Sequence, residues 1–236
     1  MSRIYLAIDT ATEACSAALS VDGKILEHFA VVQREHTQKL LPMIQALMAE
    51  SGKSFAQLDG IVCGIGPGSF AGVRIGVGVV KGLALARDLP VVAVSSLAML
   101  AHRAIRLDKA TAVVAAIDAR MNEIYFGAYR RGADGRAVAE LPDRVCSANA
   151  APLLSAGPWR GAGTGWAVYA PILRAALGAP LDQIDGAALP HAEDALYLAQ
   201  AEFAAGHTRS ADVLLPAYLR DQVALTLLEQ AALRAR

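Results

Sequence analysis

The sequence contains few cysteines and no recognisable metal-binding motif. Among its 236 residues only Cys15, Cys63 and Cys146 are cysteines, and they lie far apart without a C-x-x-C pair. This scarcity excludes a disulfide framework and a zinc knuckle, and it indicates a reducing compartment. The histidines form neither an H-x-x-x-H nor an H-E-x-x-H pair, so a metal site would have to be assembled from distant segments.

An excess of charge and a long apolar run are also missing. Lys+Arg and Asp+Glu number 22 each, so no global field attracts nucleic acid or an anionic membrane to the chain alone. Arg74 and Lys81 interrupt the most apolar stretch, and no segment of about 18 residues is free of charge, which excludes a membrane-spanning helix. The sequence opens on a strand pattern at residues 4–8 without the charged lead of a signal peptide. We therefore expect a cytoplasmic protein.

Hydrophobic residues make up 55% of the chain, which is enough for one good core or two small lobes. The first half predicts strands at residues 3–9, 14–21, 24–31, 61–63 and 90–94, and helices at 37–51, 72–87 and 95–105. The second half predicts strands at 111–118, 123–130 and 159–163, and helices at 147–155, 164–177 and 193–205. A strand-rich start followed by helices thus occurs twice.

This repetition predicts an α/β protein of two duplicated lobes with a cleft between them. We assign residues 1–106 to the first lobe, joined by the C-terminal segment 211–236, and residues 107–210 to the second. Such a layout alone does not define a function.

Residues 64–87 form a strand exit, a glycine loop and a helix of small residues. Gly72 and Gly76 make one stripe at helical spacing, and Gly78 and Gly82 make another. Because a glycine inside a helix costs roughly 1 kcal/mol relative to alanine, close packing has to offset these residues. Two interpretations stay open: the helix packs on the sheet of its own domain, or it meets a helix of another subunit.

Asp9 and Thr10 stand at the turn between the first two expected strands. In actin-like and sugar-kinase-like folds this place holds a carboxylate for magnesium and a turn that contacts phosphate. Such turns usually need glycine so that backbone N–H groups can approach the phosphate, but Thr10, Ala11 and Thr12 occupy the turn here. The alternative interpretation is that Asp9 closes a hairpin turn.

Two further patterns could have a chemical role, and each has a simpler explanation. Asp118 and Arg120 end another expected strand, where they form either a solvated ion pair or a contact to a ligand or partner. The pattern Gly66-x-Gly68-x-x-Ala71 formally matches a dinucleotide fingerprint. However, three strands precede it and no acidic residue ends the following strand, which argues against this function.

Six segments in order resemble the TsaB (YeaZ) family, and together they cover nearly the whole chain. They are LAIDTATEACSAAL at 6–19, HTQKLLPMI at 36–44, GIGPGSFAGVRIGVGVVKGLALA at 64–86, DARMNEIYFGAY at 118–129, GTGWAVY at 163–169 and LPAYLRDQVAL at 215–225. The resemblance implies an actin-like (ASKHA) fold with two βββαβα lobes, related to the enzyme TsaD but degenerate.

The resemblance also implies that this chain does not catalyse the transfer reaction. TsaD-like enzymes carry H-x-x-x-H after the strand equivalent to residues 90–94, and these histidines bind a metal. Ser96 and Leu100 occupy the two places here, and His102 is displaced from the motif. We expect no tightly bound cofactor, and ATP or ADP only within a complex. Asp9, Thr10, Asp118 and Arg120 are at most weak candidates for nucleotide contacts.

The partners implied by the family are TsaD, as a heterodimer, and TsaE, with tRNA bound through the complex and a homodimer possible for the isolated chain. Helices 37–51 and 72–87 would pair with the same two helices of TsaD. The predicted interface residues are Leu40, Met43, Ile44, Leu47, Gly72, Ile75, Gly76 and Val79.

Two other functions remain as alternatives. An active ASKHA-type phosphotransferase or ATPase would bind ATP tightly by itself. A metallopeptidase would require a bound metal, for which the sequence offers no ligand motif. The prediction is therefore a non-catalytic scaffold subunit of the TsaD complex, which adds threonylcarbamoyl to the adenosine 3′ of the anticodon in tRNAs reading ANN codons.

Overall fold

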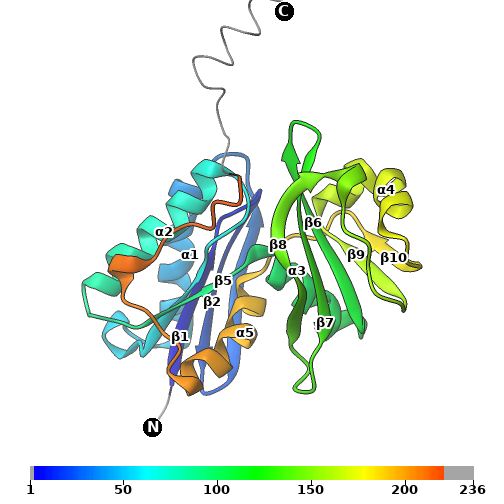
Figure 1. The fold of residues 1–236 in the computed structure, drawn as a ribbon. Helices are drawn as coiled ribbons and strands as arrows, with labels where there is room; N and C mark the ends of the chain where they lie inside the picture. The colour runs from blue at the N-terminus through cyan, green and yellow to red at the C-terminus, as the bar shows by residue number, and fades with distance from the viewer. Residues whose placement is uncertain (1–2, 221–236) are drawn as a thin grey trace, which may run out of the picture.

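A computed structural model describes residues 3–220 and shows two mixed β-sheets side by side (Figure 1). The first five-stranded sheet has the order β3-β2-β1-β4-β5. Its strands are β1 (Ile4–Asp9), β2 (Ala14–Val21), β3 (Lys24–Val31), β4 (Gly60–Gly64) and β5 (Val91–Val94). The second sheet has the order β10-β9-β6-β7-β8. Its strands are β6 (Ala112–Arg120), β7 (Glu123–Arg131), β8 (Ala137–Ser147), β9 (Trp159–Ala162) and β10 (Leu181–Asp185).

The two sheets repeat one topology. In each, the first three strands form an antiparallel meander, and the last two join in parallel on the other side of the first strand. Parallel neighbours need a crossover, and the helices that follow β4 and β9 supply it. The prediction of a duplicated α/β lobe is therefore confirmed.

The described helices cover both sheets. They are α1 (His36–Ser51), α2 (Phe70–Leu85), α3 (Ser96–Asp108), α4 (Thr164–Leu177) and α5 (Ala192–Ala205), with short 3₁₀ turns η1 (Phe55–Gln57), η2 (Ala148–Ala150) and η3 (Ala211–Val213). Helices α1 and α2 share one core with the first sheet, and α4 packs its buried Trp166 on the second. No helix within residues 3–220 is both long and apolar enough to cross a bilayer.

Each lobe gives its last helix to the other lobe. Helix α3 lies against β6 and β7, where Leu97 and Leu100 pack on the second sheet. Helix α5, which the sequence assigns to the second lobe, packs on β1, β2 and β5 of the first, with Leu196 in that core. Figure 1 shows α5 beside β1 and α3 beside β7. The lobes are thus joined by two exchanged helices as well as by the chain.

Some element predictions in the second lobe are wrong. Residues 147–155 do not form a helix, because β8 ends at Ser147 and only the single turn η2 follows it. Strand β8 was not predicted, since its residues are half-exposed and its pairing with β7 shifts register. In the C-terminal segment, Ala211 and Leu214 join the core of the first lobe, while residues 221–236 lie outside the described part.

Candidate functional site at the first strand turn

Asp9 ends β1 with its carboxyl group fully buried. Oδ1 accepts a hydrogen bond from the Ala11 N–H at 3.2 Å, and Oδ2 accepts one from the Ser96 hydroxyl at 3.0 Å. Burial raises the pKa of Asp9 to about 6, although these two hydrogen bonds favour the ionised form. The buried carboxyl group therefore has a hydrogen-bond donor from the same chain at each of its two oxygens.

The glycine loop before α2 lies directly on the turn that follows Asp9. The Ser69 N–H donates to the Ala11 carbonyl at 2.6 Å, and the Thr10 hydroxyl donates to the Gly72 carbonyl at 2.7 Å. A β-carbon on Gly68 would lie 2.0 Å from the Ala11 oxygen, and one on Gly72 would lie 2.2 Å from the Thr10 oxygen. These glycines are present because two backbones approach too closely for any side chain.

The first glycine stripe of α2 faces its own lobe, so its prediction as a partner surface is wrong. Gly72 and Gly76 are buried, and a β-carbon on Gly76 would stand 2.6 Å from the Thr10 hydroxyl oxygen. The second stripe is different, because Gly78 and Gly82 are exposed and have open space where a side chain would stand. The interpretation that the helix packs on its own domain therefore applies to the first stripe, and contact of the second stripe with another subunit stays a prediction.

Helix α1 also directs most of its predicted interface residues inward. Leu40, Ile44 and Leu47 are fully buried in the core of the first lobe, so they cannot contact a partner across its surface. The apolar face of a helix in a globular domain normally packs on the core of that domain, so it is not available to another chain. Met43, together with Ile75 and Val79 of α2, is only partly buried, and for these three the interface role stays a prediction.

Asp118 and Arg120 lie together at the end of β6, beside the turn that leads to β7. The Asp118 carboxylate accepts the Arg120 N–H at 2.9 Å and forms an ion pair with its guanidinium at 3.0 Å. The Arg120 side chain is 86% exposed. Arg120, Met121 and Asn122 all have left-handed backbone, with φ of 62°, 56° and 62°. The local ion pair accounts for both side chains, and a ligand or partner contact stays a prediction.

The C-terminal segment crosses from one lobe to the other beside this turn. The Ala217 N–H donates to the Ile65 carbonyl at 2.8 Å, just after β4. Arg220 donates to the Ala119 carbonyl at 2.9 Å and pairs with Glu123 at 2.6 Å. Since only two residues separate Ala217 from Arg220, the ends of β4 and β6 lie on the same side of the molecule.

Ser96 and Leu100, at the two positions where the resemblance implies histidines in TsaD-like enzymes, are parts of the core. Ser96 is fully buried and bonded to Asp9, and Leu100 is 1% exposed against the second sheet. Within residues 3–220, no group of three or more His, Cys, Asp and Glu side chains is arranged to hold a metal ion.

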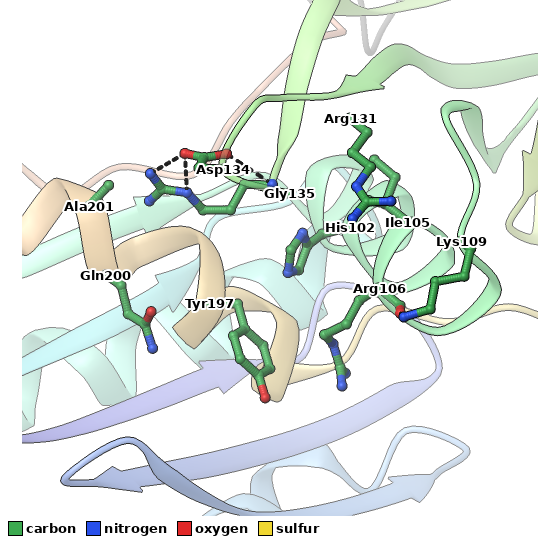
Figure 2. A pocket seen from close by; sticks show the side chains of 11 residues that line it. His102, Ile105, Arg106, Lys109, Arg131, Asp134, Gly135, Tyr197, Gln200 and Ala201 are labelled. Carbon is green, nitrogen blue, oxygen red and sulfur yellow. Dashed lines mark hydrogen bonds and ion pairs between the residues drawn. The ribbon is translucent and has the colours of Figure 1, made fainter.

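Two polar sites could not be read from the sequence, because each assembles from segments distant in the chain. Asp143 of β8 accepts hydrogen bonds from Ser95 at the start of α3 and from Tyr129 of β7, which ties the lobes together. A separate pocket of about 550 Å³ lies between α3, α5 and the hairpin joining β7 to β8 (Figure 2).

Two lobes of identical strand order, with an acidic turn after the first strand, define an actin-like (ASKHA) architecture. A model of the family described as TsaD: tRNA N6-adenosine threonylcarbamoyltransferase matches residues 28–227. The sequence is 44% identical to the tRNA threonylcarbamoyladenosine biosynthesis protein TsaB of Escherichia coli K12, over 93% of this chain and 95% of that protein. It is 42% identical to TsaB of Haemophilus influenzae, over 92% and 94% of the two chains.

A solved structure agrees with these relatives. YeaZ from Pseudomonas aeruginosa is 44% identical and superimposes with a TM-score of 0.87, over 92% of this chain and 100% of that one. The chain belongs to the TsaB (YeaZ) family, within the larger family of TsaD-like proteins.

Proposed function

We propose that this protein takes part in tRNA threonylcarbamoyladenosine synthesis as a non-catalytic subunit that supports TsaD. Its relatives bear the name of that pathway. In the proposed complex TsaD transfers threonylcarbamoyl to the adenosine 3′ of the anticodon in tRNAs reading ANN codons. TsaE is the third, ATP-hydrolysing component, and tRNA binds through the assembly.

The observation that supports a non-catalytic role is the contact between the glycine loop and the turn after Asp9. A phosphate-binding turn presents free backbone N–H groups to its ligand. Here the Ala11 N–H is already bonded to Asp9, and the Ala11 and Thr10 carbonyls lie against Gly68 and Gly72. These contacts support the proposal that the turn does not bind nucleotide phosphates by itself, and that ATP or ADP binds only with a contribution from a partner.

The surface that we assign to TsaD is the exposed face of α1 and α2. Gly78 and Gly82 leave the backbone of α2 bare, which permits a second helix to approach closely. Leu41, Phe70 and Leu85 are large apolar side chains exposed on the same two helices. Large apolar side chains that stay exposed on neighbouring helices are common at protein interfaces. A homodimer of the isolated chain would use the same face.

The experiment compares the purified chain with the reconstituted complex. The chain alone should show no saturable ATP binding by calorimetry, no ATP hydrolysis and only weak, salt-sensitive retardation of tRNA in a gel shift, since it has no net charge. With TsaD and TsaE added, threonylcarbamoyl transfer to tRNA should depend on this chain. Tight ATP binding and turnover by the chain alone, surviving repurification, would instead support the phosphotransferase alternative.

A further inference from the structure

The pocket in Figure 2 lies on the line where the two lobes meet, away from the turn after Asp9. Helix α3 gives it His102, Arg106 and the neighbouring Lys109, the β7–β8 hairpin gives it Arg131 and the segment around Asp134, and α5 gives it Tyr197. Its volume of about 550 Å³ is in the range of pockets that hold small organic ligands.

His102 forms the buried floor of this pocket. It is only 4% exposed, and neither ring nitrogen has a hydrogen-bond partner in the described part of the chain. Burial, with help from the nearby Arg106 and Arg136, lowers the pKa of His102 to about 4. The imidazole is therefore neutral near pH 7, with one N–H to donate and one lone pair to accept. Buried polar groups in folded proteins nearly always have hydrogen-bond partners, and the two ring nitrogens of His102 have none among the described residues.

The charges around the pocket are not balanced. Asp134 pairs with Arg136 across the hairpin. Arg106 is matched by Asp194 and Glu193 of α5, which also pair with Arg103.

Lys109 and Arg131 have no acidic partner within residues 3–220. The Lys109 ammonium donates to the Arg106 carbonyl at 3.2 Å, which leaves its charge uncompensated. Arg131 is exposed, and its guanidinium forms no hydrogen bond or ion pair within the described residues. Two cations without acidic partners, in the same pocket as a neutral donor-and-acceptor ring, suit a ligand with a doubly charged group and a hydroxyl.

We propose that this pocket binds a small hydroxylated phosphate monoester, such as a sugar phosphate. The phosphate lies between Lys109 and Arg131, and a ligand hydroxyl forms a hydrogen bond with one of the two unpartnered ring nitrogens of His102. Those nitrogens are covered in the unliganded protein, so binding includes a shift of the Asp134–Arg136 pair, which is held within its own hairpin. Tyr197, whose ring centroid lies 5.7 Å from that of His102, forms the adjoining wall.

The test is a calorimetric titration of the full chain with ribose 5-phosphate, inorganic phosphate and ribose. Ribose 5-phosphate should bind most tightly, inorganic phosphate more weakly, and ribose not measurably. The absence of saturable binding of ribose 5-phosphate at millimolar concentration would overturn the proposal, and so would equal binding of ribose and ribose 5-phosphate.

Two arginine variants of the second lobe separate this site from general charge attraction. Arg131→Gln should weaken ribose 5-phosphate binding about tenfold, since one charge-assisted contact is lost. Arg174→Gln removes another exposed arginine, from α4, and should leave the affinity unchanged. Equal effects of the two substitutions would show a non-specific attraction and overturn the proposal.

His102→Phe tests the hydroxyl contact. The ring that replaces the unpartnered imidazole is apolar, so the unliganded variant should melt no earlier than the wild type. In this variant ribose 5-phosphate and inorganic phosphate should bind with similar affinity, and a preserved preference for the sugar phosphate would refute the role of His102. If His102→Phe does not fold, the comparison of Arg131→Gln with Arg174→Gln still decides whether the phosphate site exists.

Discussion

At the scale of single residues, Asp9 shows how much of the first lobe is built around one acid. Its two oxygens accept bonds from Ala11 and Ser96, while no lysine or arginine pairs with it in the described chain. A β-carbon on Gly64 would lie 2.0 Å from Oδ2, so the next strand is also fitted to this carboxyl group. A buried acid without a cationic partner lowers stability when it ionises.

This burial gives Asp9 a defined effect on the pH dependence of stability. Its pKa rises from 3.8 in the unfolded chain to about 6 in the folded protein, so the native state binds this proton more tightly. The stabilisation is present below the unfolded pKa and is lost as the pH rises through about 6. Relative to Asp9→Asn, the wild type should therefore lose about 1 kcal/mol of unfolding free energy between about pH 5 and about pH 8.

Urea unfolding at both pH values measures this loss. Glu13→Gln, an exposed change beside the same turn, controls for the removal of one negative charge and should follow the wild type. An Asp9→Asn protein with the pH dependence of the wild type would show that Asp9 does not titrate in this range.

Two glycines of α2 should respond to alanine in opposite ways. Gly76→Ala places a methyl group 2.6 Å from the Thr10 hydroxyl, so it should lower the free energy of unfolding by about 1–3 kcal/mol. Gly78→Ala meets open space and should raise it by up to about 1 kcal/mol, because alanine is the better helix former. Thermal and urea unfolding of the two variants give the comparison, and a stabilised Gly76→Ala protein would contradict the packing described for Thr10.

The sequence indicates that these glycines serve close contacts, but not on which side. Gly72 and Gly78 have the same local signal, and only the position of the Thr10 turn makes one buried and the other open. For the same reason Leu40, Ile44 and Leu47 were expected at an interface although they fill the core. Helical spacing shows which residues share one face of a helix, but the tertiary structure decides what that face packs against.

At the scale of elements, α2 has two faces with different surroundings. One face closes over the turn after β1, and the other leaves Gly78 and Gly82 bare. Valine and isoleucine between them are mediocre helix formers, so packing on the sheet, with Val73, Val77 and Val80 in the core, holds the helix together.

A larger side chain on the exposed face of α2 tests the assignment of this face to TsaD. Gly78→Leu should weaken TsaD binding by roughly tenfold or more, because a side chain forces apart two helices that approach closely. Its melting temperature should not fall, because leucine has the higher helix propensity. Ala175→Leu on the exposed side of α4 adds bulk elsewhere and should leave TsaD binding intact. A pull-down in which Gly78→Leu binds TsaD as well as the wild type would refute the assigned surface.

Elements with strong periodicity were predictable and those with weak patterns were not. The expected helix at 164–177 agrees with α4 in both ends, because Gly163 and Gly178 bound a clear apolar pattern. The edge strands β8 and β10 have few buried residues and carry little periodic signal. Only the repetition of the first lobe's topology could have indicated that the second sheet contains these two strands.

At the scale of the whole molecule, the lobes are held together by both apolar and polar contacts. Helices α3 and α5 lie against each other, and Arg106 of α3 pairs with Asp194 of α5 at 3.0 Å. Asp143 of β8 joins Ser95 and Tyr129 nearby. The duplicated order was predictable from the sequence, but the exchange of the last helices was not, because local patterns do not tell which sheet a helix covers.

The exchange of α3 and α5 has a consequence for a chain that is broken in two. A cut near residue 110 would leave each piece with one helix whose apolar side belongs on the other piece. Residues 1–110 would carry α3 without β6 and β7, and residues 111–236 would carry α5 without β1 and β2. Neither piece should be soluble and cooperatively folded by itself, while co-expression should restore a stable, co-purifying pair. A first piece that unfolded alone with the cooperativity of the intact protein would show that the exchanged helices are dispensable.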